Sequence, residues 1–521
     1  MTGRHGDAAR HAVQARSHRL VRGGTLLAGL LAVLLLAAAP AGATHAAVAA
    51  GGGATADALR ARAVRAQRAH LFTAATGLYG RARDLYLAAG ETAGARACLT
   101  GMHDIEATVA SYPSTRADML DQLAAAYPDS TAAQRKAWLD RPDTEQMRWD
   151  REVHYFYGVP ANLAYRDVEL FQTQASLVAK YRRYYDTLRT YIPVAASTPA
   201  WQQYGAPRVW SFTQRLAVPR DRLPLTGELD LWLPVPIVGG AQSAVQVGDI
   251  SPAAFVTNPP SIAQDIGLLA FAIPLQALDG DLAVGSSVSF ARAAEYFKVD
   301  PARVGRYEKT GWLYRHYTAS RGNTRVTESI RRTARRVVAG EENPYLAAKR
   351  LYEYVIGTVT YSLTPHMALY PRGEAESVYV HERRYGDCGA QSTYFAALCR
   401  SAGIPARCAG GFQLFAGTPS GHFWAEFYLP GYGWVPVDPT AATMVDYLAD
   451  VTAADRAAFH RFFFGNLDDL RLTVQNDTDL PFVPAAAGRP LLTLCVQNPA
   501  ALCATMTELP ESVLWDGWSF E

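Results

Sequence analysis

The spacing of apolar residues and the composition change along the chain and divide it into regions with different predicted secondary structure. Residues 59–200 are rich in Ala, Leu, Arg and Tyr and poor in β-branched residues, which favours helices, and interruptions at proline suggest four to six of them. Residues 205–300 consist of short apolar runs separated by Pro and Gly turns, which is typical of an antiparallel β domain. Residues 325–445 mix helix and strand patterns, and 446–521 form a C-terminal extension expected to pack on that core. The sequence therefore predicts a multidomain protein with all-α, antiparallel β and α+β regions.

A helix is predicted to begin at Cys388, because apolar residues recur at helical spacing from there to Gly403. Its thiol then lies at a helix N-terminus. Unpaired backbone N–H groups and the positive end of the helix dipole favour a thiolate at such a position. We therefore expect a lowered pKa for Cys388.

A β-hairpin is predicted after this helix. A strand runs from His422 to Leu429, a Pro-Gly-Tyr-Gly turn follows, and Asp438 ends the returning strand. A simple four-residue loop would pair Asp438 with Ala425 and turn its carboxylate away from His422. The two side chains can share a face only if the turn has an odd length or contains a bulge near Gly433, and we predict one of these.

These three residue types occur in the order that a thiol acyl-transfer enzyme needs. Cys388 would be the nucleophile, and His422 would take its proton and later deliver one to the leaving amine. Asp438 would fix the imidazole tautomer and stabilise the imidazolium. A lone Cys at a helix start or a lone His on a strand is usually structural, but the three together favour catalytic roles.

Four sequence blocks in this region resemble the transglutaminase-like superfamily over about residues 325–445. They are Gly-x-Cys at 386–388, Gly-Ile-Pro-Ala-Arg at 403–407, His-x-Trp-x-Glu at 422–426 and Gly-Trp-x-x-x-Asp-Pro-Thr at 433–440. The resemblance implies a papain-like α+β fold and an activity such as glutamine acyl transfer, peptide hydrolysis or glycoprotein amidase chemistry. It also implies Cys388, His422 and Asp438 as the catalytic triad, but it does not choose an acceptor.

Such enzymes need a second donor to the oxyanion besides the Cys388 backbone N–H. Eukaryotic transglutaminases use an indole upstream of the cysteine, but no tryptophan lies between Trp312 and Cys388 here. The candidates are the phenols of Tyr361 and Tyr352 and the amide of Gln391, although Gln391 follows the nucleophile by three residues, unlike the family's donor.

Other polar residues near the motifs are expected to support the site. Trp424 and Glu426 accompany His422 in the family motif and share its strand face, so we expect them to line or brace the site, with Glu426 bonding nearby backbone. His366 and His381 fall in predicted loops without a visible partner and are expected to be structural.

The N-terminus has the pattern of an export signal. Residues 25–39 are an apolar run behind several arginines and before small residues, which predicts a signal peptide at 1–43 and a periplasmic or extracellular location. An uncleaved signal would instead be a membrane tether. Residues 44–58 are Ala- and Gly-rich and are predicted to be a disordered linker.

Charge and cysteine content narrow the possible partners. Removal of residues 1–43 would take away five arginines and one aspartate and change the formal charge from +2 to −2. The mature protein would then have no excess of positive charge, so nucleic acid is not an expected partner. The six cysteines show no zinc-binding spacing, and no cofactor is predicted. Export permits disulfides, and Cys495 with Cys503 is the favoured pair.

Three functional hypotheses remain open. The first is an exported enzyme that forms a thioester from a peptide or carboxamide of a protein or peptide substrate and passes the acyl group to water. The second passes it to an amine and forms an isopeptide bond. The third is a binding module with an inactive triad. The helical region would regulate the enzyme if it covered the cleft, and would anchor it or recognise partners if it lay elsewhere.

Overall fold

The computed structural model of the chain describes residues 44–415, 419–486, 497–503 and 517–520. The predicted signal peptide lies outside these residues. Within them, we find no helix that combines the length and the apolar character needed to cross a bilayer.

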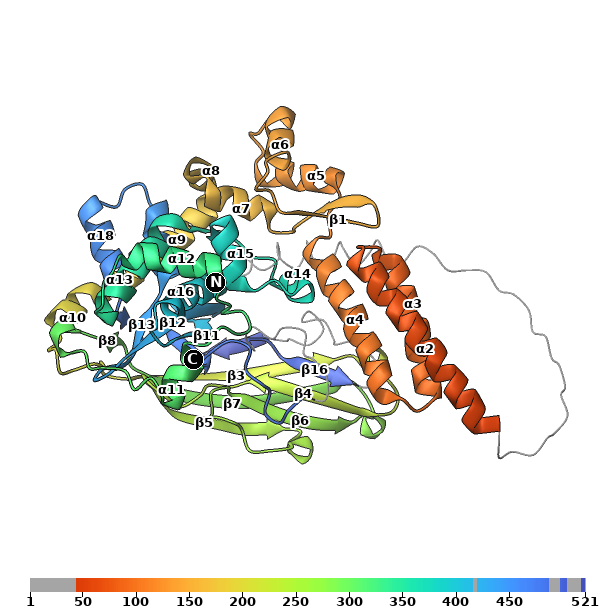
Figure 1. Cartoon of the computed structure of the whole chain (residues 1–521). Coiled ribbons are helices and arrows are strands. Elements are labelled where there is room, and N and C mark those ends of the chain that lie inside the picture. The colour runs from red at the N-terminus through yellow and green to blue at the C-terminus, as the bar shows by residue number, and fades with distance from the viewer. Residues whose placement is uncertain (1–43, 416–418, 487–496, 504–516, 521) are drawn as a thin grey trace.

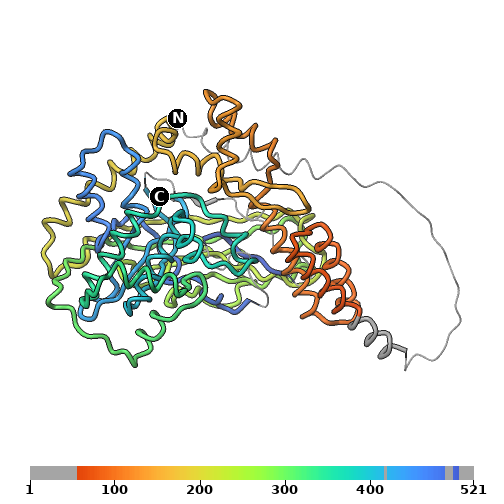
Figure 2. Tube along the Cα trace, turned by 45° about the horizontal axis from the view of Figure 1, so that its top comes forward, coloured from red at the N-terminus to blue at the C-terminus, as the bar shows by residue number. Residues whose placement is uncertain are grey.

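A helical arm, residues 44–155, projects from one side of the molecule (Figures 1 and 2). It has its own apolar core, which includes Phe72, Tyr79 and Met119. Its elements are α2 (Thr44–Arg68), α3 (Phe72–Ala88), α4 (Thr92–Ser111), α5 (Arg116–Ala126), α6 (Ala132–Leu139), β1 (Gln146–Trp149) and β2 (Glu152–Tyr155).

The prediction of a disordered linker at 44–58 was wrong, because these residues belong to helix α2. Alanine has the highest helix propensity, and the Ala-rich run continues into a segment that is held by tertiary contacts. Asp57 accepts a hydrogen bond from the Tyr86 hydroxyl at 2.5 Å, and Gln67 accepts one from Tyr79 at 2.7 Å.

A second set of helices packs mainly on the main body, and its first helix also joins the arm core through Val159 and Leu163. Their buried residues, such as Phe171, Tyr181 and Leu188, belong to the same apolar core as the catalytic region. These helices are α7 (Val159–Arg166), α8 (Val168–Thr173), α9 (Ala175–Leu188) and α10 (Tyr191–Ser197). The described residues up to 200 thus hold nine helices instead of four to six, since several short helices start at their own caps, such as Asp167 for α8.

The β-rich region consists of two antiparallel sheets, in agreement with the predicted strand type. One sheet has the order β17-β3-β7-β5 and the other β16-β4-β6, so strands from the C-terminal end of the chain complete both. The strands are β3 (Arg208–Val218), β4 (Glu228–Pro234), β5 (Gln242–Ser251), β6 (Leu268–Pro274), β7 (Leu282–Arg292), β16 (Ala500–Cys503) and β17 (Gly517–Phe520).

The α+β region is built on an antiparallel sheet of order β13-β12-β11-β15, with helix α16 packed against it (Figure 1). Its strands are β11 (Ala406–Gln413), β12 (Ser420–Leu429), β13 (Gly433–Val437) and β15 (Arg471–Gln475). The C-terminal extension therefore supplies a strand of this sheet. The same core also includes buried residues of the β-rich sheets, such as Phe290.

Short elements surround this sheet. Two-residue strands form the pairs β9 (Thr360–Tyr361) with β10 (Tyr385–Gly386), which is parallel, and β8 (Glu295–Tyr296) with β14 (Asn466–Leu467), which is antiparallel. The helices are α11 (Trp312–Tyr317), α12 (Glu328–Val338), α13 (Pro344–Thr358), α14 (His366–Leu369), α15 (Glu376–Arg383), α16 (Cys388–Ser401), α17 (Pro439–Thr443) and α18 (Ala453–Phe462).

Candidate active site

Cys388 is the first residue of helix α16, as predicted, and Asp387 is the N-cap. The Asp387 carboxylate accepts a hydrogen bond from the Ala390 N–H at 3.2 Å. The thiol is partly exposed and packs against Cys408 and Phe423 of strands β11 and β12. This contact places the nucleophile candidate beside the residue that follows His422.

The prediction of a lowered thiol pKa was wrong. Burial raises the pKa of Cys388, and the negative charge of Asp387 raises it further, while the Phe423 N–H acts in the opposite direction. The helix N-terminus is a weaker influence here because the capping carboxylate already accepts an N–H of the first turn. Cys388 therefore rests as a neutral thiol and needs a base.

The hairpin brings His422 and Asp438 together through an odd-length turn, as predicted. Leu429 pairs with Gly433, so the loop has three residues, and the positive φ of +87° at Gly433 suits a glycine. Ala425 pairs with Val437, which puts Asp438 opposite residue 424 and on the His422 face. His422 Nε2 lies 2.7 Å from Asp438 Oδ2, and both side chains are buried.

Arg471 holds the carboxylate of the candidate triad, and we did not predict it. Its Nη1 donates to Asp438 Oδ2 at 2.7 Å, while Nε and Nη2 donate to Asp468 at 3.0 and 2.8 Å. Burial would raise the pKa of Asp438, but His422 and Arg471 hold it well below its usual value. Asp438 therefore stays ionised beside the imidazole.

Arg471 escaped the prediction because it lies on β15, beyond the range that the family motifs cover. Its signal in the sequence is a charge that stands between Leu470 and Leu472, at the start of a short strand. A charged residue that is fully buried needs a partner of opposite charge, and here Asp438 is one of two.

The two residues that accompany His422 in the motif take different positions. Trp424 is fully buried, with the Arg471 guanidinium 5.3 Å from its ring centroid and the His422 ring centroid 6.4 Å away. Glu426 does not bond backbone as expected but accepts a hydrogen bond from Arg407 Nε at 2.6 Å, its partner on the neighbouring strand. Trp424 therefore braces the triad, while Glu426 stabilises the sheet two positions away.

The three oxyanion candidates differ in what they contact. Gln391 donates to the Gly386 carbonyl at 2.8 Å and so holds the turn before Cys388. The Tyr352 hydroxyl donates to the His460 carbonyl at 2.6 Å. Burial raises the pKa of the Tyr361 phenol well above its usual value, and the charge of Cys388 is the next largest cause. Of the two phenols, Tyr361 is therefore the one whose surroundings include the Cys388 thiol.

His366 was expected to be a loop residue without a partner, and this was wrong. It begins helix α14, its Nε2 lies 2.7 Å from Asp387 Oδ2, and its Nδ1 lies 2.7 Å from Glu376 Oε1. Burial opposes a charge on the ring, but the two carboxylates raise the pKa of His366 well above its usual value. A charged cluster thus lies directly beside the nucleophile.

His381, the other histidine expected to be structural, lies on helix α15 rather than in a loop. Its ring nitrogens contact the hydroxyls of Ser329 at 2.8 Å and Tyr394 at 3.0 Å. Burial lowers the pKa of His381. The ring therefore bridges helices α12, α15 and α16.

The structure describes only one of the two cysteines in the predicted disulfide. Cys495 lies outside the described residues, so the predicted pair with Cys503 has no structural description. In the ranges that are described, no group of three or more His, Cys, Asp or Glu side chains is arranged to hold a metal ion.

Aromatic residues of the second set of helices contact rings that lie near the candidate site. The rings of Tyr165 and Tyr361 meet edge to face at 4.8 Å. Tyr184 of α9 contacts Phe415 at 5.4 Å, and Phe415 in turn lies 6.2 Å from His422. Helices α7 to α9 therefore border the candidate active site, while α2 and α3 lie on the outer side of the arm and α4 packs against α14 (Figure 1).

Comparison with known proteins agrees with this site. Residues 331–439 match the sequence model of the Transglutaminase-like superfamily, and all three triad candidates lie within the match. The chain therefore carries a domain of this superfamily. The match lies within the α+β region and does not extend to the rest of the chain.

Similar proteins share only part of their length with this chain. An uncharacterised Haemophilus influenzae protein is 32% identical over 118 residues, which are 18% of this chain and 32% of that protein. Bacillus subtilis YebA is 28% identical over 131 residues, 22% of this chain and 18% of YebA. A Pseudomonas aeruginosa protein-glutamine gamma-glutamyltransferase is 32% identical over 107 residues, 18% of this chain and 15% of that enzyme.

Two solved structures are similar at low identity. A candidate cysteine protease from Cytophaga hutchinsonii has a TM-score of 0.38 at 11% identity, covering 61% of this chain and 91% of its own. A candidate protease from Parabacteroides distasonis has a TM-score of 0.19 at 12% identity, covering 58% and 48%, respectively.

Proposed function

We propose that this chain is an exported cysteine enzyme that attacks a peptide or carboxamide carbonyl of a protein or peptide substrate and forms a thioester on Cys388. The observation that carries the proposal is the buried set of His422, Asp438 and Arg471 beside a thiol at a helix N-terminus. A buried ionised carboxylate that contacts an imidazole is the arrangement that keeps a general base oriented.

The first chemical step follows from the resting state of the thiol. Because burial raises the pKa of Cys388, the thiol is neutral, and His422 takes its proton while Sγ forms a bond to the carbonyl carbon. Because His422 Nε2 contacts the Asp438 carboxylate, Nδ1 is the ring nitrogen that receives this proton. The ionised Asp438 then stabilises the imidazolium.

The tetrahedral intermediate carries its negative charge on the former carbonyl oxygen. The Cys388 backbone N–H in the first turn of α16 is one donor to this oxygen, and we propose the Tyr361 phenol as the second. When the intermediate collapses, the carbon–nitrogen bond breaks and His422 returns its proton to the leaving amine. The products of this half-reaction are the thioester and ammonia or a shortened peptide.

Water is the acceptor that we propose for the second half-reaction. His422 would take a proton from water as its oxygen attacks the thioester, and the thiol would leave with a carboxylic acid as the product. A specific observation also favours an amine acceptor, since one relative of the domain is a protein-glutamine gamma-glutamyltransferase. With an amine, the same thioester would give an isopeptide bond.

Mass spectrometry tests the proposal and separates the acceptors. The mature protein and a Cys388→Ala variant are incubated with carboxamide-rich peptides and glycopeptides and a primary amine. Cleaved or deamidated products that require Cys388 establish hydrolysis, and products that carry the amine establish acyl transfer. Cys98→Ala, which changes a buried thiol of the helical arm, is the matched control and should behave like the wild type.

Identical product spectra from the wild type and Cys388→Ala, across several peptide pools, would contradict the enzyme and favour a binding module. The export prediction has its own test, which is N-terminal sequencing of the protein secreted by its host. A mature N-terminus near residue 44 supports cleavage, and an intact N-terminus in the membrane fraction supports a tether.

A further inference from the structure

A short segment contacts helix α7 on one side and the turn before Cys388 on the other. We call residues 361–364 the strap. It begins in strand β9, whose two residues pair with the two residues of β10 just before Cys388. A parallel pair of this length is only marginally stable by itself. The strap therefore depends on side-chain contacts to hold its position.

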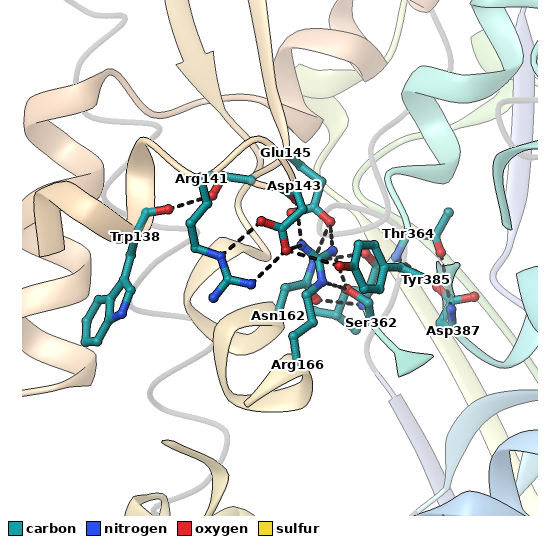
Figure 3. A network of polar contacts seen from close by, with 12 residues as sticks. Trp138, Arg141, Asp143, Glu145, Asn162, Arg166, Ser362, Thr364, Tyr385 and Asp387 are labelled. Carbon is teal, nitrogen blue, oxygen red and sulfur yellow. Dashed lines mark hydrogen bonds and ion pairs between the residues drawn. The ribbon is translucent and has the colours of Figure 1, made fainter. Parts of the chain in front are cut away.

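Helix α7 holds one side of the strap with a buried amide (Figure 3). Asn162 is 1% exposed, and its Nδ2 donates to the Leu363 carbonyl at 3.1 Å while its Oδ1 accepts the Leu363 N–H at 2.7 Å. The side chain thus pairs with the backbone in both directions, as a neighbouring strand would. A buried backbone group that lost this partner would be costly.

Arg166, one helical turn after Asn162, adds a second attachment. Its Nε and Nη2 donate to the Ser362 hydroxyl at 3.1 and 2.6 Å. The guanidinium is 5% exposed and is held by an ion pair with the equally buried Glu145 and by the Asp143 carbonyl at 2.7 Å. Because its charge is paired, Arg166 can hold a fixed position in the interior.

Arg166 also contacts the strand that leads into the nucleophile. Its guanidinium lies 4.0 Å from the centroid of the Tyr385 ring, and the Tyr385 hydroxyl donates to Asp143 at 3.2 Å. Tyr385 precedes Cys388 by three residues. The same arginine therefore fixes the strap and the β10 strand relative to each other.

The other side of the strap contacts the nucleophile turn directly. The Ser362 N–H donates to the Gly386 carbonyl at 3.2 Å. The Thr364 N–H donates to Asp387 Oδ2 at 3.1 Å, and the Asp387 N–H donates to the Thr364 hydroxyl at 3.2 Å. Asp387 is the N-cap of α16 and the neighbour of Cys388, so a shift of the strap would move the thiol.

We propose that Asn162 and Arg166 are positioning residues of the active site, which act on Cys388 through the strap. The proposal rests on Cys388 being the nucleophile. It makes helix α7, which lies outside the segment matched to the superfamily, a necessary part of the catalytic unit. The strap also begins with Tyr361, so the same contacts place the proposed oxyanion donor.

The test compares full-length variants by the rate at which iodoacetamide alkylates Cys388, followed by mass spectrometry of the peptide that contains it, over a range of pH. Asn162→Ala and Arg166→Ala should slow this reaction, and also kcat, by on the order of tenfold to a hundredfold, because small displacements of reacting groups have effects of this size. Arg166→Lys keeps a charge opposite Glu145 and should recover part of the rate.

The matched control is Arg182→Ala. It removes an arginine that joins the same set of helices to the main body through Asp450 but does not contact the strap. Its alkylation rate and kcat should equal those of the wild type. If Arg166→Ala is too unstable to measure, Ser362→Ala removes the acceptor on the strap and leaves the ion pair with Glu145, and should slow alkylation several-fold.

The outcomes separate this inference from the proposed function. If Asn162→Ala and Ser362→Ala lower the melting temperature but leave the alkylation rate and its pH profile unchanged, the two residues are merely structural and the inference is overturned. If wild-type Cys388 is alkylated no faster than Cys98, a buried thiol of the helical arm, the proposed function fails at an earlier step.

Discussion

Two histidine–carboxylate pairs flank Cys388, and they differ in the charges around them rather than in their geometry. His422 contacts Asp438 and His366 contacts Asp387, each at 2.7 Å. The carboxylate of the first pair is shared with the cation Arg471. The histidine of the second pair contacts another acid, Glu376, through its other nitrogen.

This difference assigns the two rings different tasks. Two carboxylates stabilise a cationic His366, which can hold Asp387 in place but is poorly suited to accept a proton. At His422, the one carboxylate that contacts the ring is shared with the cation Arg471, and we propose that the second nitrogen takes the thiol proton. Distance alone would not distinguish the base from the positioning residue, whereas the local charge balance does.

Replacement of the two histidines should give the largest contrast. His422→Ala should reduce kcat by about 10²- to 10⁴-fold, since it removes the proposed general base. His366→Ala should reduce it much less, through a shift of Asp387. Steady-state assays of both variants at equal folded concentration check this. Equal losses would remove the distinction between the two pairs.

Replacement of Arg471 tests the charge balance at the catalytic pair. Arg471→Met leaves Asp438 and Asp468 buried near each other without their cation and should lower the free energy of unfolding by about 3–5 kcal/mol. Urea denaturation measures this loss. Arg407→Met, which breaks the less buried pair with Glu426, is the control and should destabilise less. A larger loss in the control would contradict our assignment.

Tyr361 begins the strap and pairs with Gly386, two residues before Cys388. Tyr361→Phe should reduce kcat by roughly tenfold to a hundredfold and leave KM little changed if the phenol binds the oxyanion. Tyr352→Phe, which removes a hydroxyl bonded to the His460 carbonyl, should affect only stability, by about 1 kcal/mol. Wild-type kcat in Tyr361→Phe would remove Tyr361 from the mechanism.

The pH dependence of stability should show the smallest effect. Because folding raises the pKa of His366, its stabilising contribution is complete below the usual value of 6.5 and is lost as the pH rises through the folded-state value. Each unit of the increase contributes about 1.4 kcal/mol. Urea denaturation at pH values from about 5.5 upward measures the decline, which should be shallower in His366→Gln. An equal slope in both proteins would show that other groups cause it.

Several features of the site followed from local sequence. The helix that begins at Cys388 and the odd-length turn that turns Asp438 toward His422 were predicted from apolar spacing and strand parity, and the structure confirms both. These are local properties, because a period of 3.6 or 2 residues and the length of a turn are fixed within a few tens of residues.

Other features could not be read from nearby residues. Arg471 reaches Asp438 from another strand, and His366 meets Asp387 across 21 residues. The thiol pKa was predicted with the wrong sign because the helix terminus is visible in sequence while burial is not. Asn162 contacts Leu363 across 201 residues, and no spacing rule connects them.

The sequence by itself determined the order of nucleophile, base and carboxylate, the helix and hairpin that present them, and the superfamily of residues 331–439. The tertiary structure decided the charge around each histidine, the resting state of the thiol and the attachment of α7 to the strap. The reason is physical, since periodicity and turn length act locally, whereas burial and ion pairing depend on which distant segments share one low-dielectric interior.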